Sequence, residues 1–160
     1  MGPADHIKGI KINAAGVVDS ITFMYVIGET ADETPRYGGP GGKHNQACLL
    51  RHKNGFLSFT RSFFTPLKIN TSIIHMNSVP LQIKFFDEEY LNAISGYIGE
   101  YDGTPCISQL TFTTNMGTYG PYGDGGGTPF NLPVDEGKIA GFYGRAGTYL
   151  IAIGAYLKPN

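Results

Sequence analysis

The chain has 160 residues and a formal net charge of −1, which is the size of one ordinary domain without the basic surplus of nucleic-acid-binding proteins. Charged residues make up 16%, glycine fills 23 positions and aromatic residues contribute 12%, a composition that indicates many tight turns and excludes disorder. No apolar run reaches the roughly 18 residues of a membrane span, and the polar start MGPADHIKG has no apolar signal core, so we expect no membrane insertion and a cytoplasmic location.

Short runs rich in Val, Ile, Thr, Phe and Tyr alternate with Gly, Pro, Asn and Asp, and helical periodicity is nearly absent. This pattern predicts an all-β domain of antiparallel strands. In chain order we expect strands at Ile7–Ile12, Val17–Val26, Ile83–Phe86, Leu91–Tyr97, Ile107–Thr113, Lys138–Gly144 and Tyr149–Leu157. The last of these is apolar at nearly every position, so we expect it to be covered on both faces.

Two glycine-rich segments interrupt these strands, at Tyr37–Gly42 and Tyr119–Phe130. Glycine accepts positive φ and lets a backbone N–H approach a ligand closely, so each segment is either a simple hairpin turn or a binding loop. Between them, Ala47–Gln82 is basic, poor in glycine and without the spacing of turns. We interpret it as an insert in a single domain spanning residues 1–160: either a partner-binding elaboration or a segment with no selected fold.

One sequence pattern occurs three times, and a single slot in it changes character. The copies are AGVVDSITF at Ala15–Phe23, EEYLNAISG at Glu88–Gly96 and GTYLIAIGAY at Gly147–Tyr156. The variable slot holds Asp19 in the first copy, Asn92 in the second and Ile151 in the third. A carboxylate, an amide and a hydrocarbon differ in hydrogen bonding and charge, so the three copies are not expected to share one function.

Three parts of the chain together resemble the jacalin-related lectins, and within them the mannose-specific branch: GGPGGK, LTFTTNMGTYGPYGDGGGTPF and GKIAGFYGRAGTYLIAIGAYLKP. The resemblance covers Met1–Gln46 and Ile83–Asn160. It implies a β-prism of three four-stranded antiparallel sheets built from Greek keys, in which the three sequence copies are equivalent hairpins. It also implies that the N-terminal strand of the family and its glycine loop are missing, so we expect the prism to be incomplete there.

In this family a sugar binds between a glycine-rich loop and a Gly-x-x-x-Asp loop, whose carboxylate accepts hydrogen bonds from two adjacent hydroxyl groups. By resemblance, one such site remains in this chain, with Asp19 as the charged acceptor. The residues expected to contribute backbone donors are Gly16, Val17 and Val18 in one loop and Gly38, Gly39, Gly41 and Gly42 in the other. Ala15 stands where the motif has its first glycine, which puts the geometry of this loop in question.

The C-terminal copy is expected to be a degenerate site, formed by Gly147, Tyr149, Leu150 and Ile151. Ile151 replaces the aspartate, and a hydrocarbon cannot accept hydrogen bonds, so burying sugar hydroxyls against it would cost about 1–3 kcal/mol each. We interpret the middle copy, with Glu88 and Asn92, as structural.

The sequence therefore predicts a non-catalytic lectin for glycans containing mannose or glucose, with no cofactor and no nucleic-acid partner; homo-oligomerisation is left open. The alternative is a β-prism interaction or scaffold protein that has lost sugar binding. The four histidines have no metal-ligand spacing, so we expect no metal site, and Cys48 and Cys106 suggest no disulfide framework. No arrangement of residues predicts an active site.

Overall fold

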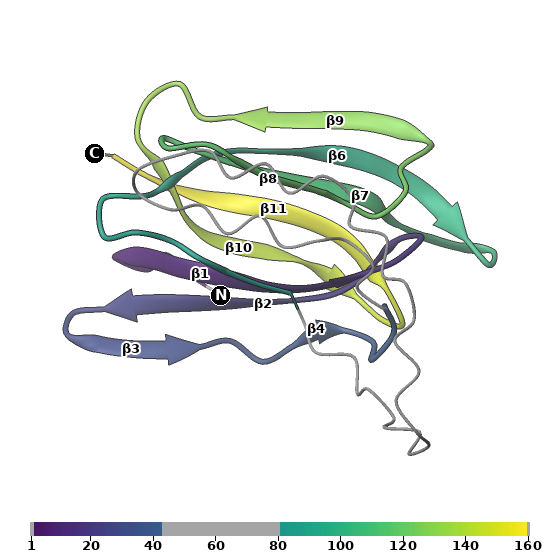
Figure 1. The fold of residues 1–160 in the computed structure, drawn as a ribbon, viewed down its shortest axis with the longest axis horizontal. Coiled ribbons are helices and arrows are strands. Elements are labelled where there is room, and N and C mark those ends of the chain that lie inside the picture. Colours follow the sequence, from purple (N-terminus) through teal and green to yellow (C-terminus); the bar gives the residue numbers. More distant parts are fainter. Residues whose placement is uncertain (1, 43–80, 160) are drawn as a thin grey trace, which may run out of the picture.

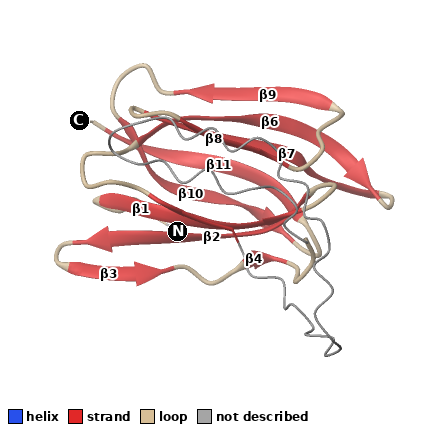
Figure 2. Cartoon of the chain, viewed as in Figure 1, coloured by secondary structure: helices blue, strands red, loops and turns tan. Residues whose placement is uncertain are grey.

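The computed structural model describes residues 2–42 and 81–159, in which every helix-or-strand element is a β-strand (Figures 1 and 2). The strands are β1 His6–Ala14, β2 Val18–Ile27, β3 Thr30–Glu33, β4 Tyr37–Gly38, β5 Leu81–Lys84, β6 Leu91–Tyr101, β7 Thr104–Thr114, β8 Thr118–Tyr122, β9 Thr128–Pro133, β10 Lys138–Ala146 and β11 Leu150–Lys158. The predicted all-β class is confirmed. Within these two ranges no helix could cross a membrane.

Three antiparallel sheets are each built on one long hairpin, as the β-prism prediction requires. The first sheet has the order β3-β2-β1-β5, with β4 also paired to β2, and the second has the order β8-β7-β6-β9. The third sheet contains only β10 and β11 among the described strands. The hairpins β1–β2, β6–β7 and β10–β11 are thus the repeated unit of the prism, and the third one lacks the outer strands that flank the other two in the described part of the chain.

The core lies where the inner faces of the three sheets meet. Phe23 from β2, Phe112 from β7 and Phe142 from β10 are each no more than 3% exposed. The rings of Phe23 and Phe142 stack at 4.2 Å with an interplanar angle of 12°, which joins the first sheet to the third. Strand β7 alternates between buried and partly exposed positions from Leu110 onward, the period expected of a strand with one face in the core. All three sheets therefore depend on one apolar cluster.

The structure contains each predicted strand, with boundaries shifted by a few residues, and adds four strands that the sequence did not predict: β3, β4, β8 and β9. These four are short or carry prolines, as β9 does at Pro129 and Pro133. Their local propensity for extended structure is low. They form because a neighbouring hairpin strand offers its edge for backbone hydrogen bonds. A short stretch of sequence does not reveal which strand will lie beside it.

The predicted C-terminal boundary of the insert is wrong. Leu81 and Gln82, which we assigned to the segment Ala47–Gln82, belong to β5 and pair with Ile12 and Lys11 of β1. Leu81 also packs against the core cluster, which explains why this end of the segment is part of the domain. Positions 47–80 lie outside the described residues.

The predicted equivalence of the three sequence copies is also wrong for the middle copy. The first and third copies lead from a hairpin turn into the second strand of their hairpins, β2 and β11. Glu88–Gly96 instead leads into β6, the first strand of its hairpin, at the opposite end from the turn that joins Tyr101 to Thr104. The few residues that begin a strand look alike in sequence. Only the pairing between strands reveals whether they begin the first or the second strand of a hairpin.

The middle copy holds a buried carboxylate in place of a binding loop. Glu89 is 5% exposed and accepts hydrogen bonds from the Thr114 hydroxyl at 2.7 Å, the Tyr119 hydroxyl at 2.8 Å and the Phe86 N–H at 3.1 Å. These bonds connect the segment before β6 to β7 and β8. The role of the middle copy is therefore structural, as the sequence predicted.

Replacing Glu89 with alanine should destabilise the fold, because the two hydroxyl donors and one amide would lose their shared acceptor. We expect the free energy of unfolding to fall by about 2–4 kcal/mol, since each unsatisfied buried polar group costs roughly 1–3 kcal/mol. Urea denaturation followed by circular dichroism measures this change. Glu88→Ala is the matched control, because Glu88 is exposed and should leave stability within about 0.5 kcal/mol of the wild type. Equal losses in both variants would contradict the network.

Candidate functional site

The hairpin turns of all three sheets meet at one end of the molecule, on the right in Figure 1. The Gly39 N–H donates to the Thr148 carbonyl at 3.1 Å, which links the first glycine loop to the turn between β10 and β11. The Asp124 N–H donates to the Gly16 carbonyl at 3.1 Å, which links the second glycine loop to the turn between β1 and β2. The predicted site residues therefore lie in one cluster of loops.

Asp19 and the first glycine loop are in direct contact, as the sequence predicted. Gly38 pairs with Ser20 of β2, and the Gly39 N–H donates to the Asp19 carbonyl at 3.2 Å. The main chain at Gly41 and Gly42 then packs on the Asp19 carboxylate: a Cβ added to Gly42 would lie 2.8 Å from Oδ2, and one added to Gly41 would overlap Oδ1. The carboxylate is thus enclosed on one side by bare backbone.

Glycine is required in this loop for its backbone angles as well as for space. Gly38 has a φ of +114° and Gly42 a φ of +82°, in the region that L-residues rarely adopt. These two residues turn the chain after β4 so that it passes across the end of β2. The spacing of the GGPGG motif therefore places the loop on Asp19.

Gly16, Val17 and Val18 contribute backbone to the site, because the valine side chains point into the protein. Val17 is 4% exposed and Val18 0% exposed. The turn is tight, with the Ala15 N–H donating to the Val17 carbonyl at 3.0 Å. Ala15 does not have a positive φ, since Asp102 is the one described non-glycine residue that does. The alanine that departs from the family motif is therefore accommodated without backbone strain.

The Asp19 carboxylate is buried, and no cation among the described residues forms an ion pair with it. The residue is 7% exposed, and the described ion pairs join other groups: Lys8 with Asp87, Lys11 with Glu33 and Lys158 with Asp5. Burial raises the pKa of Asp19, because desolvation disfavours the charged form. A buried carboxylate needs hydrogen-bond donors to offset its lost hydration, and hydroxyl groups can supply them.

The third hairpin repeats this turn without the acid. The Gly147 N–H donates to the Tyr149 carbonyl at 2.9 Å, which is the same turn as that between Ala15 and Val17. Leu150 is 3% exposed, and Ile151 lies over Gly147, its Cδ1 being 3.7 Å from a Cβ added there. The structure thus places all four residues of the predicted degenerate site in one turn, with a hydrocarbon in the position of the carboxylate.

Sequence reasoning missed the residue equivalent to Asp19 in the second sheet. The Gly125 N–H donates to the Ser108 carbonyl at 3.2 Å, just as Gly39 donates to Asp19, so Ser108 takes the place that we assigned to Asn92. The Ser108 hydroxyl donates to the Gly126 carbonyl at 2.6 Å and is therefore engaged within its own glycine loop. A signal was present in the sequence: Ser108 is followed at the second and fourth positions by Leu110 and Phe112, as Asp19 is by Ile21 and Phe23.

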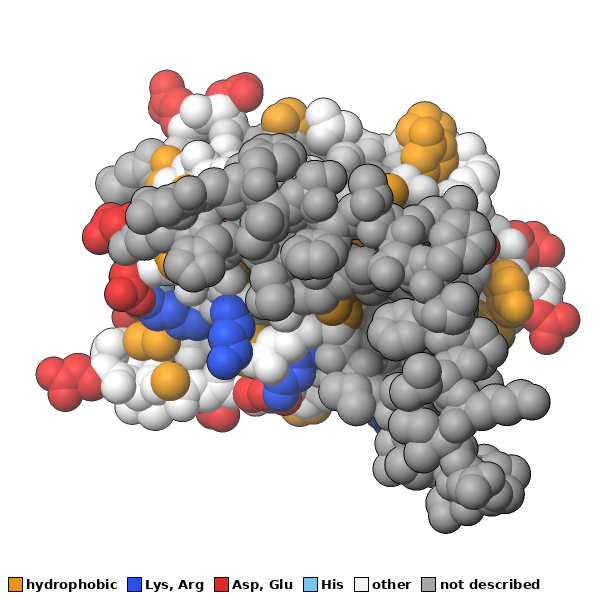
Figure 3. Space-filling view, viewed as in Figure 1, with side chains coloured by type: hydrophobic (Ala, Val, Ile, Leu, Met, Phe, Trp, Pro, Cys, Tyr) orange, Lys and Arg blue, Asp and Glu red, His pale blue; other side chains and the backbone are white. Residues whose placement is uncertain are grey.

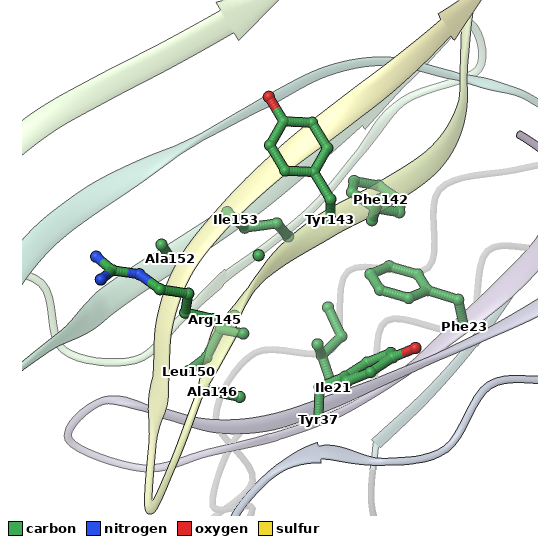
Figure 4. A pocket seen from close by; sticks show the side chains of 11 residues that line it. Ile21, Phe23, Tyr37, Phe142, Tyr143, Arg145, Ala146, Leu150, Ala152 and Ile153 are labelled. Carbon is green, nitrogen blue, oxygen red and sulfur yellow. The ribbon is translucent and has the colours of Figure 1, made fainter. Parts of the chain in front are cut away.

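A separate cavity of about 210 Å³ lies between the first and third sheets and has a different character (Figure 4). Ile21, Phe23, Phe142 and Ile153 line it, while the Arg145 guanidinium and the Tyr143 phenol point away from the group. Asp19 is not among the lining residues. An apolar lining of this kind offers few partners for sugar hydroxyls, so the cavity is not the predicted site.

The described residues contain no group of three or more His, Cys, Asp or Glu side chains that could hold a metal ion. In the described part of the face shown in Figure 3, acidic side chains lie around the rim and a small group of basic side chains lies at the lower left. Among the described residues, Asp19 and its glycine loop place a carboxylate beside bare backbone, and they form the candidate site for a polar ligand.

Known proteins share both the sequence and this architecture. Residues 1–156 match the family described as Jacalin-like lectin domain. A mannose/glucose-specific lectin of Parkia pendula is 49% identical over 161 residues, which cover 99% of this chain and 34% of the relative. The structure of Malaysian banana lectin matches with a TM-score of 0.75 and 37% identity, over 100% of this chain and 88% of that one.

A mannose-binding jacalin-related lectin from Ananas comosus matches with a TM-score of 0.74 and 32% identity, over 100% of this chain and 87% of that one. This chain spans about a third of the length of the Parkia pendula lectin, at 34%. The family match runs through all three hairpins and both glycine loops. The chain belongs to the jacalin-like lectin domain family.

Proposed function

We propose that this chain is a non-catalytic lectin domain that binds mannose or glucose residues of glycans through Asp19 and the first glycine loop. The observation that carries the proposal is the contact of the Asp19 carboxylate with the bare main chain of Gly41 and Gly42. The names of the Parkia pendula and Ananas comosus relatives support this class of ligand. Among the three equivalent turn positions, Asp19 alone combines a charged acceptor with a glycine loop.

The binding chemistry follows from what each group can donate or accept. Ionised Asp19 can accept hydrogen bonds from two neighbouring sugar hydroxyls, and such charge-assisted bonds are short and strong. The glycine loop and the turn at Gly16 and Val17 offer amide groups to the same ring. No bond of the sugar is broken by this arrangement, since it provides neither a nucleophile with a base nor a pair of carboxylates flanking the ligand.

Replacing Asp19 with alanine should weaken binding of methyl α-mannoside at least tenfold and up to about a hundredfold, because a hydrogen bond to a charged group contributes roughly 1.5–3 kcal/mol. Isothermal titration calorimetry measures the dissociation constant. Asp135→Ala, at an exposed position at the opposite end of the prism, controls for the loss of one negative charge and should bind as the wild type does. A folded wild-type chain that binds no mannose would instead favour the scaffold alternative.

Binding should also depend on pH through the same residue. The raised pKa of Asp19 means that its carboxylate takes up a proton at a higher pH than an ordinary aspartate, and the protonated form is a poorer acceptor. Mannose affinity should therefore be constant near neutrality and fall as the pH drops through this raised pKa. Titrations across mildly acidic pH test this, and Asp19→Asn should bind weakly with no such dependence. A wild-type affinity that stays flat to below pH 4 would contradict it.

The role of the glycine loop can be tested with one methyl group. Gly41→Ala should weaken mannose binding about tenfold or more, because the added Cβ would push directly on the Asp19 carboxylate. Gly147→Ala is the matched control: its Cβ would meet only Ile151, at an ordinary 3.7 Å, in the turn that has no acid. Glycan-array signals and titration of both variants provide the comparison. Equal losses would indicate that the two turns share in binding.

A further inference from the structure

The outer face of the hairpin formed by β10 and β11 carries a pair of exposed aromatic rings. Tyr143 is 56% exposed and Tyr156 is 40% exposed, and their rings lie 5.2 Å apart at an interplanar angle of 56°. Figure 4 shows the Tyr143 ring directed away from the apolar cavity, and Tyr156 shares this face because the two rings are in contact. The pair therefore offers apolar ring surface and two hydroxyl groups to a ligand.

A glycine on the neighbouring strand holds the Tyr143 ring close to the sheet. Tyr143 of β10 lies directly opposite Gly154 of β11 in the register of the hairpin. A Cβ added to Gly154 would lie 2.5 Å from Cζ of the Tyr143 ring and 2.8 Å from its Cε2. The ring therefore rests on bare backbone, and its exposed area is the side that faces away from the sheet.

A cation lies two positions beyond Tyr143, on the same face of β10. Arg145 is exposed, and Figure 4 shows its guanidinium directed away from the cavity. None of the three ion pairs among the described residues involves Arg145. The strands β10 and β11 together contain three cationic residues and no acidic one. This face therefore favours a ligand with negative charge.

We propose that the outer face of β10 and β11 binds a glycan that carries carboxylate groups. Arg145 would bind a carboxylate, because a guanidinium and a carboxylate form two parallel hydrogen bonds. Tyr143 and Tyr156 would pack against sugar rings, whose C–H faces are apolar, while their phenol groups bond to sugar hydroxyls. Uronic acids combine a carboxylate with a sugar ring in one residue. The ligand class is therefore an acidic polysaccharide that contains uronic acid.

This surface is separate from the proposed mannose site. Asp19 and the first glycine loop lie where the hairpin turns meet, whereas Tyr143 and Tyr156 lie within the strands on the outer face of the hairpin. A strand paired to either edge of the hairpin would leave this face open, because paired strands extend a sheet in its own plane. The inference goes beyond the proposed function, and the two can be tested separately.

Single-stranded nucleic acid is the alternative ligand with related chemistry, since bases also stack on tyrosine rings. It fits this chain less well. A phosphate chain is bound by several cations along its length, and the formal net charge of the protein is −1. A glycan with carboxylates on only some of its residues needs one arginine beside the rings, which is the arrangement at Arg145, Tyr143 and Tyr156.

The probe is a hyaluronan octasaccharide, in which glucuronate alternates with a neutral sugar, titrated into the protein by calorimetry at low ionic strength. The wild type should bind it, and should bind the carboxyl-reduced octasaccharide about tenfold more weakly or worse, because reduction removes the partner of Arg145. Arg145→Gln and the double variant Tyr143→Ala with Tyr156→Ala should each raise the dissociation constant for hyaluronan about tenfold. Lys84→Gln is the matched control: it removes an exposed cation from the first sheet and should bind as the wild type does.

Circular dichroism verifies that each variant keeps its strand content, so a lost surface is distinguished from a damaged fold. Asp19→Ala should keep hyaluronan binding, and excess methyl α-mannoside should not displace the octasaccharide. A chain that binds hyaluronan in this way but binds no mannoside supports the inference and contradicts only the proposed function. The inference is overturned by a wild type that ignores hyaluronan or binds the carboxyl-reduced form equally well. Full binding by Arg145→Gln, loss of binding in Asp19→Ala, or tighter binding of single-stranded oligo(dT) would also overturn it.

Discussion

One constraint governs this fold: three hairpins must bury their apolar faces against one another, because none of them could form a core alone. The parallel stack of Phe23 on Phe142 fixes the first sheet against the third, and Phe112 brings in the second. Once the hairpins pack in this way, their turns necessarily meet at one end of the prism. The functional loops are thus neighbours as a consequence of the core, which explains how Gly39 can bond both to Asp19 of its own sheet and to Thr148 of another.

The repeated architecture supplies three equivalent positions, and the side chain at each one decides its chemistry. Asp19 retains a charged acceptor that is desolvated and faces bare backbone. Ser108 uses its hydroxyl to hold its own glycine loop, and Ile151 has no polar atom to offer. The charged form of Asp19 costs stability, since its burial raises the pKa of the carboxyl group through desolvation. A loss of stability of this kind is typical of residues at binding sites. Glu89 differs from Asp19, because its carboxylate accepts three hydrogen bonds from the surrounding protein.

The sequence by itself determined the β class and each hairpin strand, because alternating apolar residues and turn residues act over short distances along the chain. The contact of Asp19 with the first glycine loop was expected from the resemblance to the jacalin-related lectins, and the structure contains this contact. Only the tertiary structure decided that β3, β4, β8 and β9 are strands, since these segments owe their extended form to hydrogen bonds with a neighbour. It also moved the boundary of the insert to before Leu81 and replaced Asn92 by Ser108 as the equivalent of Asp19. Both corrections depend on which strand lies beside which, and that is fixed by packing around the shared core.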